Sequence, residues 1–162
     1  MSVSELMRKA LAEAEGRDGF RCTALGPLVI AVFDRTSNVQ AAEALGRVLA
    51  QTARANPTLA ILTVVGPDCS VPDSTVRNRL TSEVKLIQKQ LVAAVTVIEG
   101  SGFRTAAVRA AVTGMTLLLK ASAYPAKTFA TVPEGGDFLA GILSIGADDI
   151  ADAVKQLRSR AA

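Results

Sequence analysis

The stretch LVIAVFDRTSNVQAAEALGRVLAQTARANPTLAILTVVG, residues 28–66, decides the fold because it joins two apolar runs through a helical pattern. Each run is short and almost entirely apolar, which is typical of a strand buried on both faces of a sheet. Between the runs, apolar side chains recur along one helical stripe: Val39, Ala42, Leu45 and Leu49. Ser37 and Gln40 have the spacing of a capping box, and Asn56-Pro57 ends the pattern. The stretch predicts a right-handed strand–helix–strand unit with parallel strands.

The same alternation continues on both sides of this stretch. Downstream, a helical pattern from residue 74 leads to the apolar run AAVTVIEG (93–100), and a second helix over 102–122 leads to AKTFATV (126–132). Upstream, FRCTALG (20–26) meets the first run through Gly26-Pro27, as in a hairpin. Further short helices are expected over 2–15, 133–143 and 147–162. The order predicts one α/β domain, a mixed and mostly parallel five-stranded sheet with helices packed on it.

The composition argues against several classes of function. The chain of 162 residues has no histidine, the commonest general base near neutral pH and the commonest metal ligand. Its two cysteines, Cys22 and Cys69, cannot complete a four-ligand structural zinc site. The net charge is only +3, basic residues are dispersed, and aromatic residues make up 4% of the chain. We therefore expect no cofactor, no metal and no nucleic-acid partner.

The sequence lacks the marks of a membrane protein and of a serine enzyme with a lysine base. Charges interrupt residues 1–19, and the apolar runs are too short to cross a bilayer. Two distant cysteines suit a reducing compartment, so a cytoplasmic protein without a membrane span is expected. Ser82 and Lys85 have the S-x-x-K spacing but lie in a helical pattern without the partner motifs of that enzyme class. We expect no catalytic residues and no enzyme activity.

Binding groups in such a sheet gather in the loops after the carboxyl ends of the strands. The loop 99–104, EGSGFR, places two glycines before a helix and is able to present backbone N–H groups to an anion. It lacks the full dinucleotide and phosphate-loop motifs, so a tight corner is the favoured interpretation, with Phe103 in the core. Glu99 is then expected to pair with Arg104, and Gly114 is expected to mark a close helix contact.

The loop 66–75 carries the second candidate. Asp73 or Ser74 is expected to cap the following helix, since both residue types accept hydrogen bonds from free backbone N–H groups. A phosphate on Ser74 is the alternative use of the same position, because it would add charge to a binding face without changing the fold.

In layout, residues 20–143 resemble a STAS domain, the fold of bacterial anti-sigma-factor antagonists and of SpoIIAA-like proteins. VFDRTSNVQAAEALGRVL (32–49) resembles the family's strand–Leu-Asp-x-x-Thr–helix entry. LAILTVVGPDCSVPDSTVRNRL (59–80) is similar to its apolar strand followed by Asp-Ser-Ser-Gly, although Thr75-Val76 replaces the Ser-Gly. AAVTVIEGSGFRTAAVRAAV (93–112) stands where the family has its next strand and helix. The resemblance implies that Ser74 is the position phosphorylated by a partner kinase.

The resemblance also implies the function. We expect a non-enzymatic regulatory or protein–protein interaction domain in signalling, whose partner is a regulatory kinase, a similar protein or a second copy. The expected face comprises loops 34–38, 66–76 and 99–104, and phosphorylation of Ser74 is an optional switch. Its candidate residues are Asp34, Asp73, Ser74, Thr75, Glu99, Ser101 and Arg104. Residues 1–19 and 144–162 are expected to form an N-terminal helical extension and a C-terminal helix outside the resemblance. The alternative is a small-ligand module whose helices cover an apolar pocket for a lipid or a nucleotide.

Overall fold

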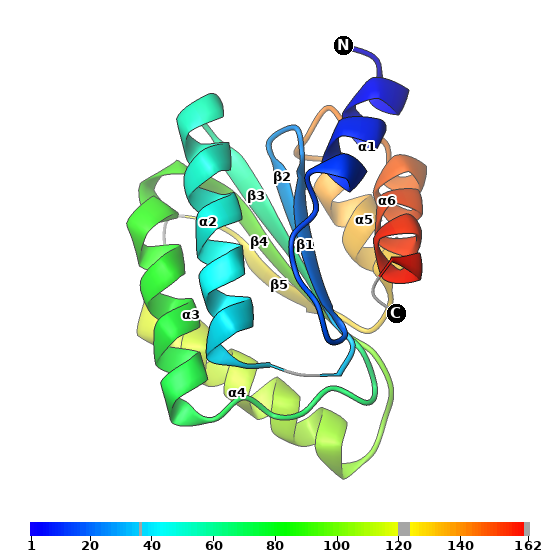
Figure 1. Ribbon diagram of the computed structural model, residues 1–162. Helices are drawn as coiled ribbons and strands as arrows, with labels where there is room; N and C mark the ends of the chain where they lie inside the picture. Colours follow the sequence, from blue (N-terminus) through cyan, green and yellow to red (C-terminus); the bar gives the residue numbers. More distant parts are fainter. Residues whose placement is uncertain (36, 120–123, 161–162) are drawn as a thin grey trace.

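A computed structural model describes residues 1–35, 37–119 and 124–160 of the chain (Figure 1). One mixed sheet has the strand order β1-β2-β3-β4-β5. Its strands are β1 (Phe20–Leu25), β2 (Leu28–Phe33), β3 (Leu59–Val65), β4 (Leu91–Ile98) and β5 (Ala126–Phe129). The β1–β2 hairpin is antiparallel, and every other neighbouring pair is parallel. The predicted single α/β domain with a mostly parallel five-stranded sheet is confirmed.

Within the described residues, six α-helices cover the two faces of the sheet (Figure 1). They are α1 (Val3–Ala12), α2 (Val39–Ala55), α3 (Ser74–Ile87), α4 (Phe103–Leu119), α5 (Val132–Ala140) and α6 (Ala147–Ser159). The strands from β2 to β5 are added in one direction, so the right-handed crossovers place α2, α3 and α4 on the same face. The helices α1, α5 and α6 cover the other face. The sheet is therefore the middle layer of three.

Each face of the sheet has its own apolar core. One cluster joins the sheet to α1, α5 and α6 and includes Met7, Leu11, Ile150 and Leu157. The helices at the two ends of the chain thus belong to the core of the domain. On this side α5 lies so close to the sheet that a Cβ at Gly135 would stand only 2.9 Å from Val97 Cγ2. The second cluster joins the sheet to α2, α3 and α4.

Several local expectations need correction. Asn38, rather than Ser37, caps α2 by accepting a hydrogen bond from the Ala41 N–H (2.8 Å). The first helix starts with a capping box of Ser2 and Glu5, an S-x-x-E signal that the sequence contains. Gly114 does not mark a close contact, since a Cβ there would meet nothing within 4 Å. Three parts of the expected elements lie outside the described residues: Thr36 of loop 34–38, the end of the expected helix at 120–122, and the end of the last expected helix at 161–162.

Candidate functional site

Arg158 on α6 holds two of the predicted face residues, Asp34 and Glu99, at the carboxyl end of the sheet. Its Nε and Nη2 donate to the Asp34 carboxylate at 3.2 and 2.9 Å. Its Nη1 donates to Glu99 Oε2 at 3.1 Å, and its Nη2 also donates to Glu99 Oε1. Hydrogen bonding to Glu99, and then to Asp34, raises the pKa of the Arg158 guanidinium. We call these three residues the Arg158 clasp.

The clasp replaces the expected pairing of Glu99 with Arg104. Asp34 follows β2 and Glu99 follows β4, so the two carboxylates stand on either side of the end of β3. The residue after β3 is Gly66, and a Cβ there would lie 2.5 Å from Asp34 Oδ1. A glycine at this position therefore leaves the Asp34 carboxylate room to reach Arg158. Both carboxylates are used inside the fold, which limits what they offer a partner.

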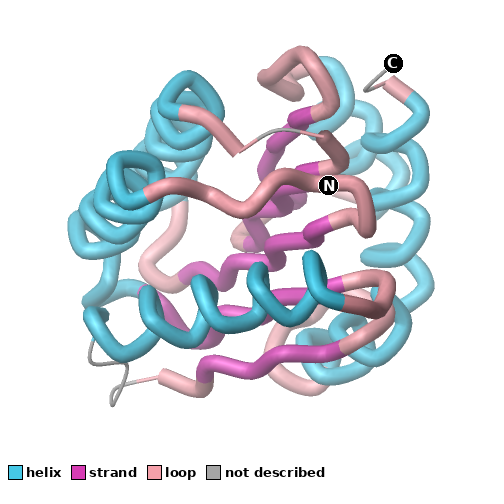
Figure 2. The backbone as a smooth tube through the Cα atoms, turned by 90° about the horizontal axis from the view of Figure 1, so that it is seen from below, coloured by secondary structure: helices cyan, strands magenta, loops and turns pink. Residues whose placement is uncertain are grey.

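The loops 66–73 and 99–104 meet at one end only, away from the Asp73-Ser74 cap, beside which the 99–104 corner was expected to lie. Arg104 Nη1 donates to the Asp68 carbonyl at 3.4 Å, and Gly100 lies against Pro67. The first turns of α3 and α4 stand at opposite ends of loop 66–73 in both Figure 1 and Figure 2. The corner at 99–104 therefore lies beside the start of that loop, away from Ser74. Ser101 is exposed at the corner, and its carbonyl accepts a bond from Thr105 (3.3 Å).

Asp73 and Ser74 have different roles at the start of α3. Asp73 is the cap, because its Oδ1 accepts a hydrogen bond from the Val76 N–H at 2.9 Å. Ser74 and Thr75 follow in the first turn and are exposed. An anion is stabilised at this end of a helix by the free N–H groups and the helix dipole. The Ser74 hydroxyl is thus accessible and lies where a phosphate is tolerated.

The helix α4 is apolar yet largely exposed. Among its 17 residues only Thr105 and Val108 are buried. Three large apolar side chains point to solvent: Phe103 is 91% exposed, Leu117 73% and Leu118 59%. The expectation that Phe103 lies in the core is wrong. Small exposed residues separate these side chains, so we define the α4 outer face as Phe103, Ala106, Ala110, Gly114, Leu117 and Leu118.

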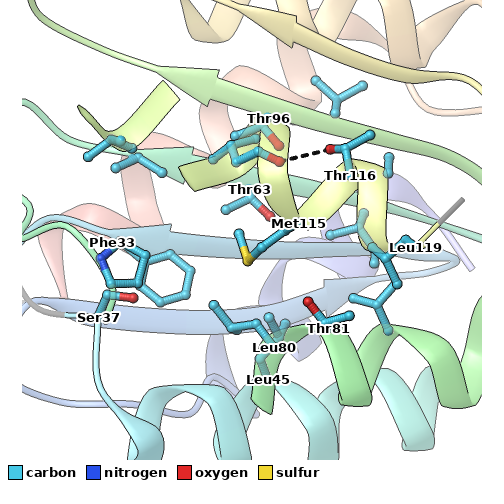
Figure 3. Close-up of a pocket in the computed structure, with 18 of the residues that line it drawn as sticks. Phe33, Ser37, Leu45, Thr63, Leu80, Thr81, Thr96, Met115, Thr116 and Leu119 are labelled. Atoms are coloured by element: carbon cyan, nitrogen blue, oxygen red, sulfur yellow. Dashed lines mark hydrogen bonds between the residues drawn. The ribbon is translucent and has the colours of Figure 1, made fainter. Parts of the chain in front are cut away.

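A cavity of about 140 Å³ lies on the other side of α4, between this helix, α3 and the sheet (Figure 3). Its walls are mostly apolar and come from β3, β4, α3 and α4; they include Ile61, Val84, Ala94, Val112 and Met115. The lining extends to Ser37 and the exposed Ser70 at the loop end of the sheet and to Leu119 and Tyr124 at the other end. None of the described residues that line it is charged.

Threonine hydroxyls interrupt the apolar wall of the cavity. Thr63 and Thr96 are register partners in the carboxyl-terminal halves of β3 and β4. Thr81 of α3 is 6% exposed, and its Oγ1 is buried without a hydrogen-bond partner among the described residues. Thr116 is satisfied, since its Oγ1 donates to the Val112 carbonyl at 3.0 Å. Figure 3 shows the hydroxyls of Thr63 and Thr81 turned toward the same space.

The two cysteines are buried thiols. Burial raises the pKa of Cys69, in the cavity wall, to about 11. Burial likewise raises the pKa of Cys22 to about 12. The thiolate is the reactive form, so neither group is activated as a nucleophile. Within the described ranges, no three His, Cys, Asp or Glu residues are placed to hold a metal ion, and no helix is long and apolar enough to cross a membrane.

Comparison of the chain with protein-family models, with curated proteins and with solved structures found no match.

The sequence did not reveal the Arg158 clasp or the α4 outer face, and it suggested an apolar pocket without locating it. Arg158 is separated from Asp34 by 124 positions, and no local pattern links them. The cavity did leave a signal, because a threonine interrupts each of the apolar runs LAILTVV and LVAAVTVI, and the two are aligned in the sheet.

Proposed function

We propose that the chain is a non-enzymatic regulatory domain that binds a protein partner through the α4 outer face and the adjoining loops 66–76 and 99–104. The observation that supports this most is the exposure of Phe103, Leu117 and Leu118 on one helix. Contiguous apolar surface of this kind marks protein interaction sites. Aromatic side chains such as Phe103 are enriched at the buried centres of such interfaces. The proposal agrees with what the resemblance to STAS domains implies, with the binding surface moved toward α4.

The chemistry of α4 indicates what the partner presents. Ala106, Ala110 and Gly114 leave a low ridge between Phe103 and Leu117, so a second helix is able to approach closely. The charged residues of α4 are Arg104 and Arg109, and the helix has no acid. A second copy of α4 would bring the same positive charges to the interface. A different protein, with an apolar surface bordered by Asp or Glu, fits this face better.

The test of this proposal compares two α4 variants with a matched control. Phe103→Ser and Leu117→Ser/Leu118→Ser each remove apolar anchors, whereas Ile142→Ser removes a side chain that is 40% exposed beyond α5. A partner captured by the wild type and by Ile142→Ser should be lost with both α4 variants. Its binding is then measured with purified proteins, and the α4 changes should weaken it at least tenfold. Equal affinity for all four proteins would refute the proposal, and a dimer broken by the α4 changes would identify the partner as a second copy.

Ser74 is the proposed switch of this interaction. Ser74 is the first residue of α3, and its hydroxyl is exposed. It follows loop 66–73, whose first residues contact Arg104 through the Asp68 carbonyl. A phosphate would place about −1.5 to −2 charges at that loop. Ser74→Glu should therefore change partner affinity, while Ser82→Glu, an exposed position in the middle of α3, should leave it unchanged. Equal binding by Ser74→Glu and the wild type would remove the switch from the proposal and leave the α4 face intact.

A second function, the small-ligand module, is favoured by the cavity beneath α3 and α4. The nucleotide form of that alternative finds no support there, because the described lining offers no cation for a phosphate.

A further inference from the structure

We propose that the cavity beneath α3 and α4 binds a small, neutral, mostly apolar molecule that carries one hydrogen-bonding oxygen, of the size and kind of a phenol. This inference is independent of the partner-binding proposal, since it concerns the inner side of α4.

The size of the cavity sets the size of the ligand. Its volume of about 140 Å³ is close to that of an engineered cavity in another protein, about 150 Å³, which binds benzene. Well-packed protein interiors contain few voids larger than a water molecule. A space of this volume beneath two helices is thus large enough for a single aromatic ring or a short branched chain.

The walls set the polarity of the ligand. Most of the lining is aliphatic, with Val84, Val112 and Met115 facing the sheet residues Ile61 and Ala94. The described lining has no Asp, Glu, Lys or Arg. Moving an ion into such a site without a partner is strongly unfavourable. Carboxylates, phosphates and ammonium groups are therefore disfavoured, and a neutral molecule is favoured.

The hydroxyl groups require the oxygen on the ligand. The Thr81 hydroxyl is buried, faces the cavity and has no partner among the described residues (Figure 3). Buried polar groups are almost always hydrogen-bonded in folded proteins, so an unpaired one needs an explanation. Thr63 and Thr96 face the same cavity from neighbouring strands. A ligand oxygen, which both accepts and donates if it is a hydroxyl, would satisfy Thr81 and one of the sheet hydroxyls.

Phenol is the probe, with toluene and benzoate as comparisons. Toluene has nearly the same size but no oxygen, and benzoate is charged at neutral pH. One net hydrogen bond corresponds to an affinity ratio of about 2- to 12-fold. We expect phenol to bind more tightly than toluene by a ratio in this range and benzoate not to bind. Equal binding of phenol and toluene would show that the hydroxyls do not select the ligand.

The methionines report whether the probe enters this cavity. The chain has three: Met115 lines the cavity, Met7 is buried on the opposite face of the sheet, and Met1 is exposed. With ¹³C-methyl methionine, phenol should shift the Met115 resonance and leave Met7 unchanged. If the Met115 methyl resonance does not shift at millimolar phenol, the threonine hydroxyls are hydrogen-bonded by water alone, and the proposal is overturned.

Two substitutions complete the test. Thr81→Val keeps the shape of the side chain and removes the hydroxyl. It should weaken the binding of phenol by about 2- to 12-fold and leave the affinity for toluene unchanged. Thr75→Val, on the exposed first turn of the same helix, is the matched control and should change neither affinity. Ala94→Leu fills the cavity and should abolish binding of both probes. If Ala94→Leu fails to fold, the Thr81→Val comparison and the Met115 shift still decide the question; unchanged phenol affinity in Thr81→Val would overturn the hydroxyl's role.

Discussion

Replacing Arg158 by methionine should destabilise the domain because it removes the cation that joins α6 to the ends of two strands. Methionine keeps much of the apolar stem, so packing changes little while the guanidinium is lost. Asp34 and Glu99 would then face each other as two unpaired carboxylates. Like charges held at one site repel each other, so the loss includes this repulsion as well as the lost hydrogen bonds.

The magnitude follows from the exposure of the three side chains. Arg158, Asp34 and Glu99 are 26%, 29% and 26% exposed, so the clasp is neither a surface pair nor a buried one. An exposed ion pair contributes about 0–1 kcal/mol, and breaking a buried pair costs about 3–5 kcal/mol. We expect a loss of about 2 kcal/mol in the free energy of unfolding. For a chain of this size that loss lowers Tm by about 4–8 °C.

Urea unfolding followed by circular dichroism measures this loss directly. Lys155→Met is the matched control, because it removes an exposed cation from the same helix and should cost less than about 0.5 kcal/mol. A double-mutant cycle with Glu99→Gln isolates the pair, and the coupling energy should be about 1 kcal/mol or more. If Arg158→Met costs no more than Lys155→Met, or if the cycle shows no coupling, the clasp does not stabilise the fold.

Three further outcomes are expected. Thr81→Val should raise the free energy of unfolding of the ligand-free protein by about 1 kcal/mol, since it removes an unpaired buried hydroxyl, whereas Thr52→Val should lower it because that hydroxyl donates to a backbone carbonyl at 2.7 Å. Gly66→Ala should cost about 1–2 kcal/mol by pushing Asp34 away from Arg158, and denaturant unfolding would show a smaller cost in an Asp34→Ala background. Because burial raises the pKa of Cys69 to about 11, the unfolded chain loses this proton first, so stability measured across a pH series should fall above about pH 9, and the fall should be smaller in Cys69→Ala.

The layout of the sheet could be predicted from the sequence because each element is marked by its own local signal. The runs at 28–33 and 59–65 are almost entirely apolar, and both became strands buried between helix layers. The helix between them ends where Asn56-Pro57 predicted. The helix that connects each pair of runs indicated parallel strands, and the usual right-handed crossover placed those helices on one face of the sheet. These signals act over a few residues, which is why they can be read without knowing the fold.

The clasp could not be predicted because it depends on where α6 ends relative to the sheet. Glu99 and Arg104 are close in sequence, which made their pairing the natural expectation. The corner at Gly100 and Gly102, with φ of 90° and 93°, instead turns the chain so that Arg104 reaches the Asp68 carbonyl. Arg158 reaches Glu99 from α6, on the opposite face of the sheet from α4, and pairs with it. Contacts between distant segments are decided by packing, which leaves no local signal.

The exposed helix and the cavity have a common physical origin in the composition of α4. A helix that covers a sheet normally has one apolar stripe and one polar face. In FRTAAVRAAVTGMTLLL, apolar residues occur all around the helix, so no orientation buries them all against one sheet. Met115 and Val112 face the cavity, while Leu117 and Leu118 face solvent. A helix with this composition is stabilised most when apolar side chains on both of its sides are buried. The proposed ligand beneath α4 and the proposed partner outside it would together bury the side chains that the isolated domain leaves exposed or loosely packed.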